Sequence, residues 1–315
     1  MKNSKRLVSI AAVAILGTSL AACSSGPEAE PGAEPSFSIG FVNANTLEYH
    51  TCLEKGVAEA AESLGVKLTV VNSTADPAKE QTNVEDLLAQ SPDALMLQTV
   101  NVDSLAQAVT KANTADVPIF MTSVAGNPEA DILGAVVAQF AKSATLLADW
   151  ASQDADGKSV NVAIVAGAPG AASDLFVNSF KENLSSNLNV VFEQPGMFNR
   201  GKAQEVAENL LQSNPDVEYI YVPNEEMSFG VLAALQAAGR DDIKILANGG
   251  TEAGLAAVES GDFTVMTTES AYELGHLALE TVVQALEDEE IEKIQGLDPV
   301  LVTVDNIAEA PAYCG

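Results

Sequence analysis

The chain has 315 residues and a formal net charge of −29, with 44 acidic residues against 15 Lys and Arg. Such an acidic surface repels nucleic acid and anionic lipid, so the composition argues against binding to either one. The acids are spread along the whole chain, which is typical of a soluble or salt-tolerant surface, although a preference for cationic ligands also fits.

The first 22 residues predict a secretory signal peptide. Lys2, Lys5 and Arg6 precede an uncharged, mostly apolar stretch over residues 7–20, which is too short to span a membrane as a mature helix. The stretch ends in Leu-Ala-Ala-Cys at Cys23, which resembles the lipobox of bacterial lipoproteins. This resemblance implies an extracytoplasmic protein that is anchored to the outer face of the cell membrane by a lipid on Cys23 alone. An ordinary signal peptide that ends near a cysteine is the alternative.

Residues 23–35 predict a linker. They are rich in Glu, Pro, Ala and Gly, and a segment of low hydrophobicity with repeated proline cannot bury a core, so we expect it to be disordered. About 280 residues remain from residue 36 onward, which is enough for two lobes of ordinary size.

Strand-like and helix-like segments alternate from residue 36 onward. We expect strands at residues 37–42, 67–72, 94–98, 117–121, 160–165, 190–193, 219–222, 243–247 and 263–267. We expect helices that include residues 47–64, 77–90, 202–212 and 271–286. Asp76 and Pro77 form a helix-start signal, and Gly65 and Gly239 follow helix ends. Strict alternation predicts an α/β fold with parallel sheets covered on both faces.

An internal repeat divides the chain. The pattern Leu-Leu-x-x-x-Pro-Asp occurs at residues 87–93 and 210–216, each time at a helix end before a strand. Asn101 and Asn224 then fall at the same distance past the repeated Asp, and both are candidate binding residues. The repeat predicts two similar Rossmann-like lobes. Ligands of such sheets bind at the carboxyl ends of the strands.

No catalytic or metal-binding motif stands out. The sequence has no Gly-x-x-x-x-Gly-Lys loop, no Gly-x-Ser-x-Gly turn and no His-Glu-x-x-His helix. His50 and Cys52 together supply too few ligands for a closed metal site. As a nucleophilic pair they lack an orienting third group. We therefore expect a protein with no catalytic residue, no metal and no cofactor, and keep an enzyme that uses Cys52 and His50 as an alternative.

Two cysteines remain beyond Cys23. In an oxidising compartment Cys52 and Cys314 predict one disulfide between the first helix and the C-terminal tail, and free buried thiols are the alternative.

Aromatic and amide side chains gather in the loops after the strands. Tyr49 and His50 follow the first strand, Phe198 follows a strand of the second half, and Asn224 precedes a helix. Flat rings beside polar groups suit a small polar molecule with one apolar face, because the ring covers that face and the polar groups orient the molecule.

At this point the sequence resembles a known family, the ribose-type periplasmic binding proteins of sugar ABC transporters, from about residue 36 to residue 304. The segments that carry the resemblance are Leu-Glu-Lys-Gly at 53–56, Asp-Pro-Ala-Lys at 76–79, Lys-Ala-Asn at 111–113, Val-Pro-Ile at 117–119, Asn-Glu-Glu-Met at 224–227 and Gly-Thr at 250–251. The resemblance implies the type I binding-protein fold.

The resemblance also implies binding residues. The stacking aromatics fall on Tyr49, His50 and Phe198, and the polar contacts fall on Gln98, Asn224 and Glu269.

Four positions depart from the family pattern. Ser123 and Val124 stand where an Asp-Arg pair is usual, Gly249 replaces an Asp, and Phe176 replaces an Arg. The lost groups form charge-assisted hydrogen bonds to sugar hydroxyls. An ordinary aldopyranose is therefore disfavoured. A pocket with Tyr49, Phe176, Phe198 and the acid Glu269 better suits a flatter or partly cationic ligand, such as a nucleoside, an amino sugar or a small amine. A shift of one or two residues in the alignment of these loops would also explain the departures.

The expected architecture is two lobes joined by three crossovers near Val137, Glu269 and Pro299. Residues 36–137 with 270–299 form the first lobe, and residues 138–269 with 300–315 form the second. By resemblance, a monomer closes on a small-molecule ligand and docks on an ABC permease in the membrane. A lipoprotein that senses a ligand for a transmembrane receptor is the alternative.

Overall fold

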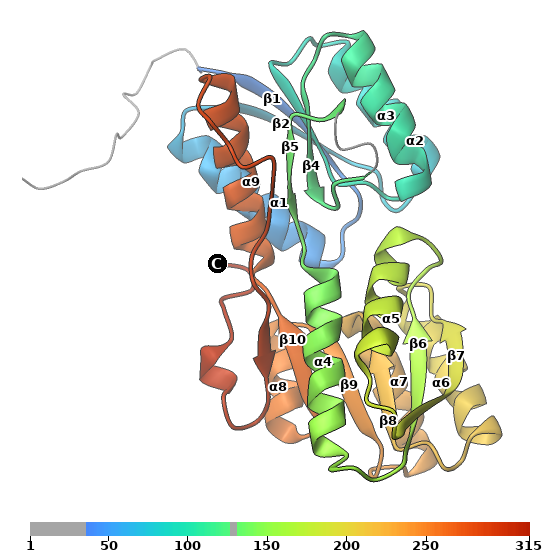
Figure 1. Ribbon diagram of the computed structural model, residues 1–315. Coiled ribbons are helices and arrows are strands. Elements are labelled where there is room, and N and C mark those ends of the chain that lie inside the picture. The colour runs from blue at the N-terminus through green and yellow to red at the C-terminus, as the bar shows by residue number, and fades with distance from the viewer. Residues whose placement is uncertain (1–35, 127–130) are drawn as a thin grey trace, which may run out of the picture. The chain divides into compact units, whose positions relative to one another are not determined.

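The computed structural model describes residues 36–126 and 131–315 (Figure 1). The predicted signal peptide over residues 1–22, the lipidation site Cys23 and the predicted linker over residues 23–35 lie outside the described residues. Within the described ranges, no helix is long and apolar enough to cross a membrane.

The first lobe is built on a six-stranded parallel sheet in the order β11-β5-β4-β3-β1-β2. Its strands are β1 (Ser38–Asn43), β2 (Lys67–Asn72), β3 (Ala94–Leu97), β4 (Ile119–Ser123), β5 (Gly134–Val137) and β11 (Ile294–Gln295). The helices that pack on it are α1 (Glu48–Ser63), α2 (Pro77–Leu88), α3 (Val102–Thr114) and α9 (Ala271–Leu286).

The second lobe repeats this order, with a sheet β12-β10-β9-β8-β6-β7. Its strands are β6 (Val160–Ala166), β7 (Leu188–Pro195), β8 (Tyr219–Val222), β9 (Lys244–Gly249), β10 (Val265–Thr268) and β12 (Val300–Val302). Its helices are α4 (Phe140–Asp154), α5 (Ala171–Asn183), α6 (Arg200–Ser213), α7 (Glu225–Ala238) and α8 (Glu252–Ser260), followed by the short 3₁₀ helix η2 (Ile307–Glu309).

Helices cover both faces of each sheet. In β1, Phe41 packs in the core under α1 and α9, while its neighbour Val42 packs in the core under α2. In β8, Ile220 and Tyr221 divide in the same way between the core of α6 and α7 and the core of α4 and α5. Successive side chains of a strand point to opposite faces, so strands covered on both sides are apolar throughout, as the sequence pattern indicated.

The predicted α/β fold with two parallel-sheet lobes is confirmed, with one antiparallel strand added. Strand β12 pairs antiparallel with β10, and Val300 lies opposite Thr268. The chain reaches β12 directly from β11 in the other lobe, so it enters the second sheet at the end where the parallel strands finish. It must therefore run in the opposite direction. The short strands β5 and β11 were not predicted, because four and two residues carry too little pattern.

The chain passes between the lobes after β5, after β10 and between β11 and β12, and its tail returns to the first lobe after η2. The C-terminal segment 300–315, which we expected in the second lobe, divides between the two. Strand β12 and η2 contact the second lobe, whereas Tyr313 and Cys314 contact α9 and α1 of the first.

The predicted helix ends follow from local chemistry. The Asp76 carboxylate accepts hydrogen bonds from the backbone N–H groups of Ala78 at 2.8 Å and Lys79 at 3.3 Å, with Pro77 at the first helical position. Gly65 and Gly239 adopt left-handed backbone conformations, with φ of 64° and 66°.

Candidate ligand-binding cavity

The loops that follow the strands of both sheets line one cavity of about 610 Å³, which is within the usual range for small-molecule sites. It is lined from the first lobe by the residues after β1, β3 and β4, and from the second lobe by those after β6, β7, β8, β9 and β10. The ten residues expected to bind ligand all line it: Tyr49, His50, Gln98, Asn101, Ser123, Phe176, Phe198, Asn224, Gly249 and Glu269.

Tyr49, Ser123 and Gln98 form a hydrogen-bonded group on the first-lobe wall. The Tyr49 hydroxyl lies 2.8 Å from the Ser123 hydroxyl, and the Gln98 amide donates to that same hydroxyl at 3.1 Å. Ser123 adopts a positive φ of 69°, a conformation that non-glycine residues hold mainly where the surroundings impose it. Gln98 is 3% exposed, and its Oε1 has no hydrogen-bond partner among the residues that the structure describes. This wall therefore offers a buried acceptor.

Tyr49 and His50 do not form a parallel pair of stacking rings. Their rings meet edge to face, with centroids 5.4 Å apart and planes at 89°. The Asn43 amide donates to the His50 carbonyl and to Glu54, which fixes the start of α1. Burial lowers the pKa of His50 to about 4, so its imidazole is neutral at pH 7.

Phe198 lies against the backbone of Gly167. A Cβ at Gly167 would lie 2.1 Å from Cζ of the Phe198 ring, so only glycine leaves room for it. Phe176 has a different setting, because it is 3% exposed and packs on Phe140 with ring centroids 4.6 Å apart. Phe176 is thus mainly a core residue whose edge reaches the cavity.

The two asparagines play different parts. Asn224 is the N-cap of α7, and its Oδ1 accepts from the Met227 N–H at 3.0 Å. Asn224 also lines the cavity, and no hydrogen bond of its amide NH₂ is found in the described residues, so this group can donate to a ligand. Asn101 lies at the entrance of α3, where its backbone exchanges hydrogen bonds with the Thr99 hydroxyl.

Gly249 makes room for a buried carboxylate. A Cβ there would lie 2.2 Å from Oε2 of Glu225. Glu225 accepts from the N–H of Gly250 at 2.8 Å, from the N–H of Thr251 at 3.1 Å and from the Thr251 hydroxyl. The space that the family's Asp would take is therefore occupied by Glu225, which starts α7 after the neighbouring strand β8.

Four carboxylates line the cavity, and its lining in the described part of the chain contains no Lys or Arg. Burial raises the pKa of Glu269 to about 7. The Gln139 N–H donates a long hydrogen bond of 3.4 Å to this carboxylate, which by itself lowers the pKa. Burial, and then the carboxylates of Glu225 and Glu226, raise the pKa of Glu48. A positive charge nearby would lower these raised pKa values, because it favours the ionised carboxylates. The cavity is therefore electrostatically suited to a cation or to a ligand with many hydrogen-bond donors.

Several lining residues were missed from the sequence. Glu48 and Glu226 flank residues that the sequence did indicate, and Asn248 stands one position before Gly249. A search along each loop after a strand end would have found these three. Tyr313 had no such signal, because it comes from the C-terminal tail.

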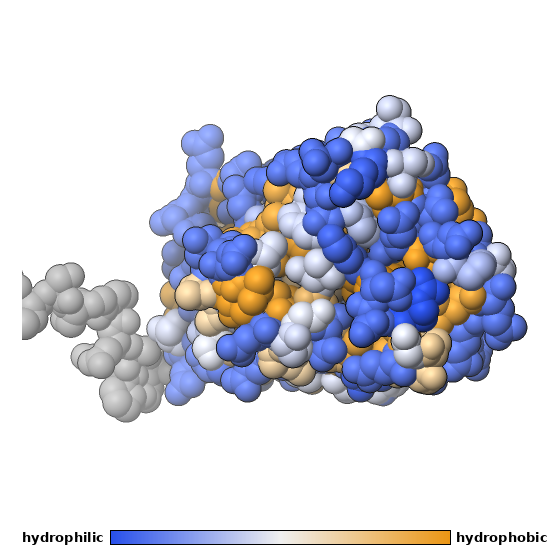
Figure 2. Space-filling view, turned by 90° about the horizontal axis from the view of Figure 1, so that it is seen from below, coloured by the Kyte–Doolittle hydropathy of each residue, from blue (hydrophilic) through white to orange (hydrophobic). Residues whose placement is uncertain are grey.

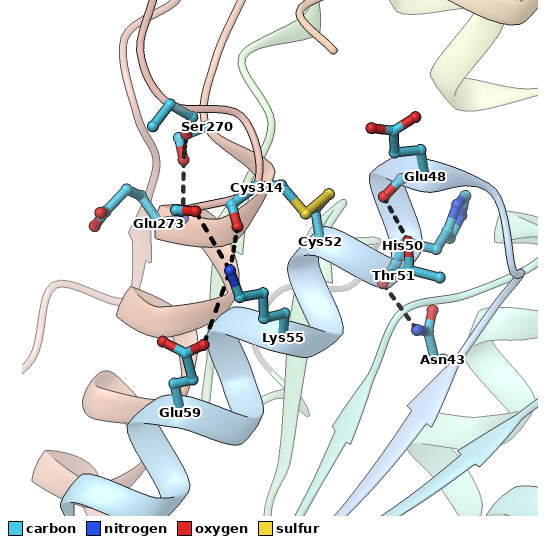
Figure 3. Close-up of a disulfide and its surroundings, with 12 residues drawn as sticks. Asn43, Glu48, His50, Thr51, Cys52, Lys55, Glu59, Ser270, Glu273 and Cys314 are labelled. Carbon is cyan, nitrogen blue, oxygen red and sulfur yellow. Dashed lines mark hydrogen bonds and ion pairs between the residues drawn. A yellow bond between two sulfur atoms is a disulfide. The ribbon is translucent and has the colours of Figure 1, made fainter. Parts of the chain in front are cut away.

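Cys52 and Cys314, which are 262 positions apart in sequence, form a disulfide with Cα atoms 4.7 Å apart (Figure 3). Cys52 is therefore not a free thiol, and the nucleophilic pair with His50 that an enzyme would use is absent. Among the described residues, no group of three His, Cys, Asp or Glu side chains is placed to hold a metal.

Comparisons with known proteins agree with this architecture. A family model described as a periplasmic binding protein domain matches residues 39–290. The ribose import binding protein RbsB of Bacillus subtilis is 30% identical over 282 residues, covering 87% of this chain and 91% of that protein. The xylitol-binding protein of Mycolicibacterium smegmatis is 25% identical, covering 84% and 75%.

A solved structure shows the same fold. It is an ABC transporter solute binding protein from Bacillus halodurans with bound myo-inositol, with a TM-score of 0.82 at 22% identity, covering 89% of this chain and 98% of that one. The family match and the two-lobed fold thus define a periplasmic-type binding protein. By sequence, the chain belongs to the periplasmic binding protein family.

Proposed function

We propose that this chain is the solute-binding lipoprotein of an ABC importer. Cys23 carries the lipid, residues 24–35 give the binding domain its reach, and the closed protein docks on a permease as a monomer. The lipobox pattern and the names of the relatives support this proposal.

One observation carries the binding role, namely that loops from both sheets line the same cavity. A ligand that contacts both lobes binds a closed form more tightly than an open one. Its differential affinity then shifts the population toward closure. The named residues are Tyr49, His50 and Phe198 for ring contacts, with Gln98, Asn224 and Glu269 for polar contacts.

The ligand class follows from the charges. Two relatives are named for ribose and xylitol, and the similar solved structure contains bound myo-inositol. These three compounds support a polyhydroxylated ligand. The acidic lining, the absence of Lys and Arg from it in the described residues and the free Gln98 acceptor favour ligands that donate hydrogen bonds. We therefore propose a sugar-like molecule, with amino sugars, nucleosides and small amines as the classes to test first beside neutral sugars.

A thermal-shift screen of the full chain in detergent micelles tests the proposal. The compounds are D-ribose, D-allose, xylitol, myo-inositol, D-glucosamine and adenosine. A compound at 100 times its Kd stabilises the folded protein by about 2.7 kcal/mol. No shift with any small molecule would refute the binding role. A shift only with neutral sugars would refute the preference for amines.

Transport and sensing are separated in cells. An importer subunit is needed for uptake, so deleting its gene should abolish accumulation of the radiolabelled compound that the screen identifies. Unchanged uptake together with a lost transcriptional or chemotactic response would support the sensor instead.

A further inference from the structure

The C-terminal tail brings an aromatic side chain to the cavity. After η2, residues 310–315 return to the first lobe, and Tyr313 lines the cavity beside residues of both lobes. Tyr313 comes from neither a strand end nor a helix start, which supply most of the wall.

The tail is held from several sides (Figure 3). The Ser270 hydroxyl donates to the Ala312 carbonyl at 2.6 Å, and the Tyr272 N–H donates to the Tyr313 carbonyl at 3.1 Å. The Lys55 ammonium donates to the Cys314 carbonyl at 2.8 Å. The Cys52–Cys314 disulfide then joins the tail covalently to α1. Fixed on both sides of residue 313, the backbone presents the tyrosine ring in one place.

Tyr313 reaches across to the second lobe. A Cβ at Gly250 would lie 2.9 Å from Cδ2 of the Tyr313 ring, so the ring rests against the backbone that follows β9. Burial, followed by the charges around it, among them Glu225 and Glu269, raises the pKa of Tyr313, so its hydroxyl stays protonated at pH 7. No hydrogen-bond partner of this hydroxyl is found in the described residues.

We propose that Tyr313 contacts the ligand and that the Cys52–Cys314 disulfide positions it. The ring offers an apolar face to a sugar-like molecule, and the hydroxyl donates to one of its oxygen atoms. This inference rests on the proposed binding function. It adds a residue from the tail to the site and gives the disulfide a part in binding.

The competing explanation is that the tail only braces the two lobes. In that case Tyr313 fills space, and loss of the disulfide acts through stability alone. A double-mutant cycle separates the two explanations, because residues that act through one another are not additive in affinity.

Binding of D-ribose, D-allose, xylitol, myo-inositol, D-glucosamine and adenosine is measured by calorimetry on the full chain in detergent micelles. The variants are Tyr313→Phe, Tyr313→Ala, Cys314→Ser and the double variant Tyr313→Ala with Cys314→Ser. Tyr221→Phe is the matched control, because the Tyr221 hydroxyl is buried in the second-lobe core, has no partner within residues 36–126 and 131–315, and does not line the cavity.

For each compound that binds the wild type, we expect Tyr313→Ala to weaken binding at least about tenfold and Tyr313→Phe about fivefold, the usual effect of a lost hydrogen bond. Cys314→Ser should weaken binding several-fold, but by less than about twofold when Tyr313 is already Ala. The thermal midpoint should fall with Cys314→Ser in both backgrounds. Tyr221→Phe should bind as the wild type does.

Wild-type affinity in both Tyr313→Phe and Tyr313→Ala would overturn the contact. If Cys314→Ser weakens binding equally in the wild type and in the Tyr313→Ala background, the disulfide does not position Tyr313. The explanation that the tail only braces the two lobes would then hold. If the wild type binds none of the compounds, the proposed function fails and this inference with it. Tyr313→Phe keeps the ring and its packing, so it tests the hydroxyl even if Tyr313→Ala fails to fold.

Discussion

At Glu269 the fold changes the acidity of a side chain that faces the cavity. The folded protein raises its pKa from 4.5 to about 7, chiefly through burial. Because the folded state holds the proton more tightly than the unfolded state, this group favours folding only below the unfolded pKa. The contribution is lost as the pH rises from 4.5 to about 7 and stays lost above that.

We therefore expect Glu269→Gln to flatten the pH dependence of stability over that interval. The difference is about 3 kcal/mol at most, since one pKa unit corresponds to about 1.4 kcal/mol. Urea unfolding at pH 5 and pH 8 for wild type and variant measures it, and the comparison cancels the other acids. Equal pH dependence in both proteins would contradict the raised pKa.

Gly167 fixes the wall that Phe198 forms. Gly167→Ala places a Cβ 2.1 Å from the ring, so we expect the ring to move and ligand affinity to fall at least about tenfold. Gly201→Ala is the matched control, because its Cβ would meet its nearest neighbour, Asn199 Oδ1, at 3.5 Å. Calorimetry with D-ribose and D-glucosamine is the measurement. If Gly167→Ala binds the ligand as tightly as the wild type does, Phe198 is not part of the binding site.

Helix α7 shows how one residue serves an element and the site together. Asn224 caps the helix with its oxygen. Asn224→Ala should lower the free energy of unfolding by about 1 kcal/mol and also weaken binding. Asn224→Asp keeps the cap oxygen but loses the amide donor, so it should retain stability and still weaken binding of a neutral sugar.

The control for α7 is Asp76→Ala, which removes the equivalent cap of α2. Asp76 does not line the cavity, so only stability should change. Urea unfolding and calorimetry on the four proteins give both quantities. Loss of affinity in Asp76→Ala as large as in Asn224→Ala would mean that helix capping alone explains the effect.

Helices α1 and α9 show what limits prediction at this scale. Gly56 lies against the Tyr272 carbonyl and Gly275 against the Leu53 carbonyl, with would-be Cβ distances of 2.0 and 2.1 Å. The apolar pattern predicted both helices within one or two residues, because the pattern is local. Their close contact was not predicted, since it joins segments more than 200 residues apart.

The whole molecule is closed by the disulfide between α1 and the tail. A cross-link over 262 residues removes much conformational freedom from the unfolded chain. We expect Cys314→Ser to lower the free energy of unfolding by about 2–5 kcal/mol. Urea unfolding with and without a thiol reductant measures this effect. The reductant should destabilise only the wild type, and an equal effect on the variant would contradict the explanation.

The surface of the whole molecule agrees with its composition. Figure 2 shows a face where hydrophilic residues predominate and hydrophobic residues form scattered patches. The exposed large hydrophobic residues of the described chain are few: Leu64, Leu175, Val190, Val191, Met197 and Val304.

The sequence by itself determined the alternation of strands and helices, the repeated lobe, the helix caps and the strand-end loops that line the cavity. These features depend on neighbours within one or two turns of the chain, so they can be read from spacing. It also indicated ten lining residues, about half from their place after strand ends, where parallel strands meet at one edge, and the rest by the resemblance to the ribose-type family.

Only the tertiary structure decided which side chains occupy that cavity and how. Glu225 fills the space that Gly249 leaves, Phe176 packs into the core, and Tyr313 arrives on a tail joined to Cys52. Each of these depends on contacts between segments far apart in sequence, whose distances are set by the packing of whole elements. No local pattern records them.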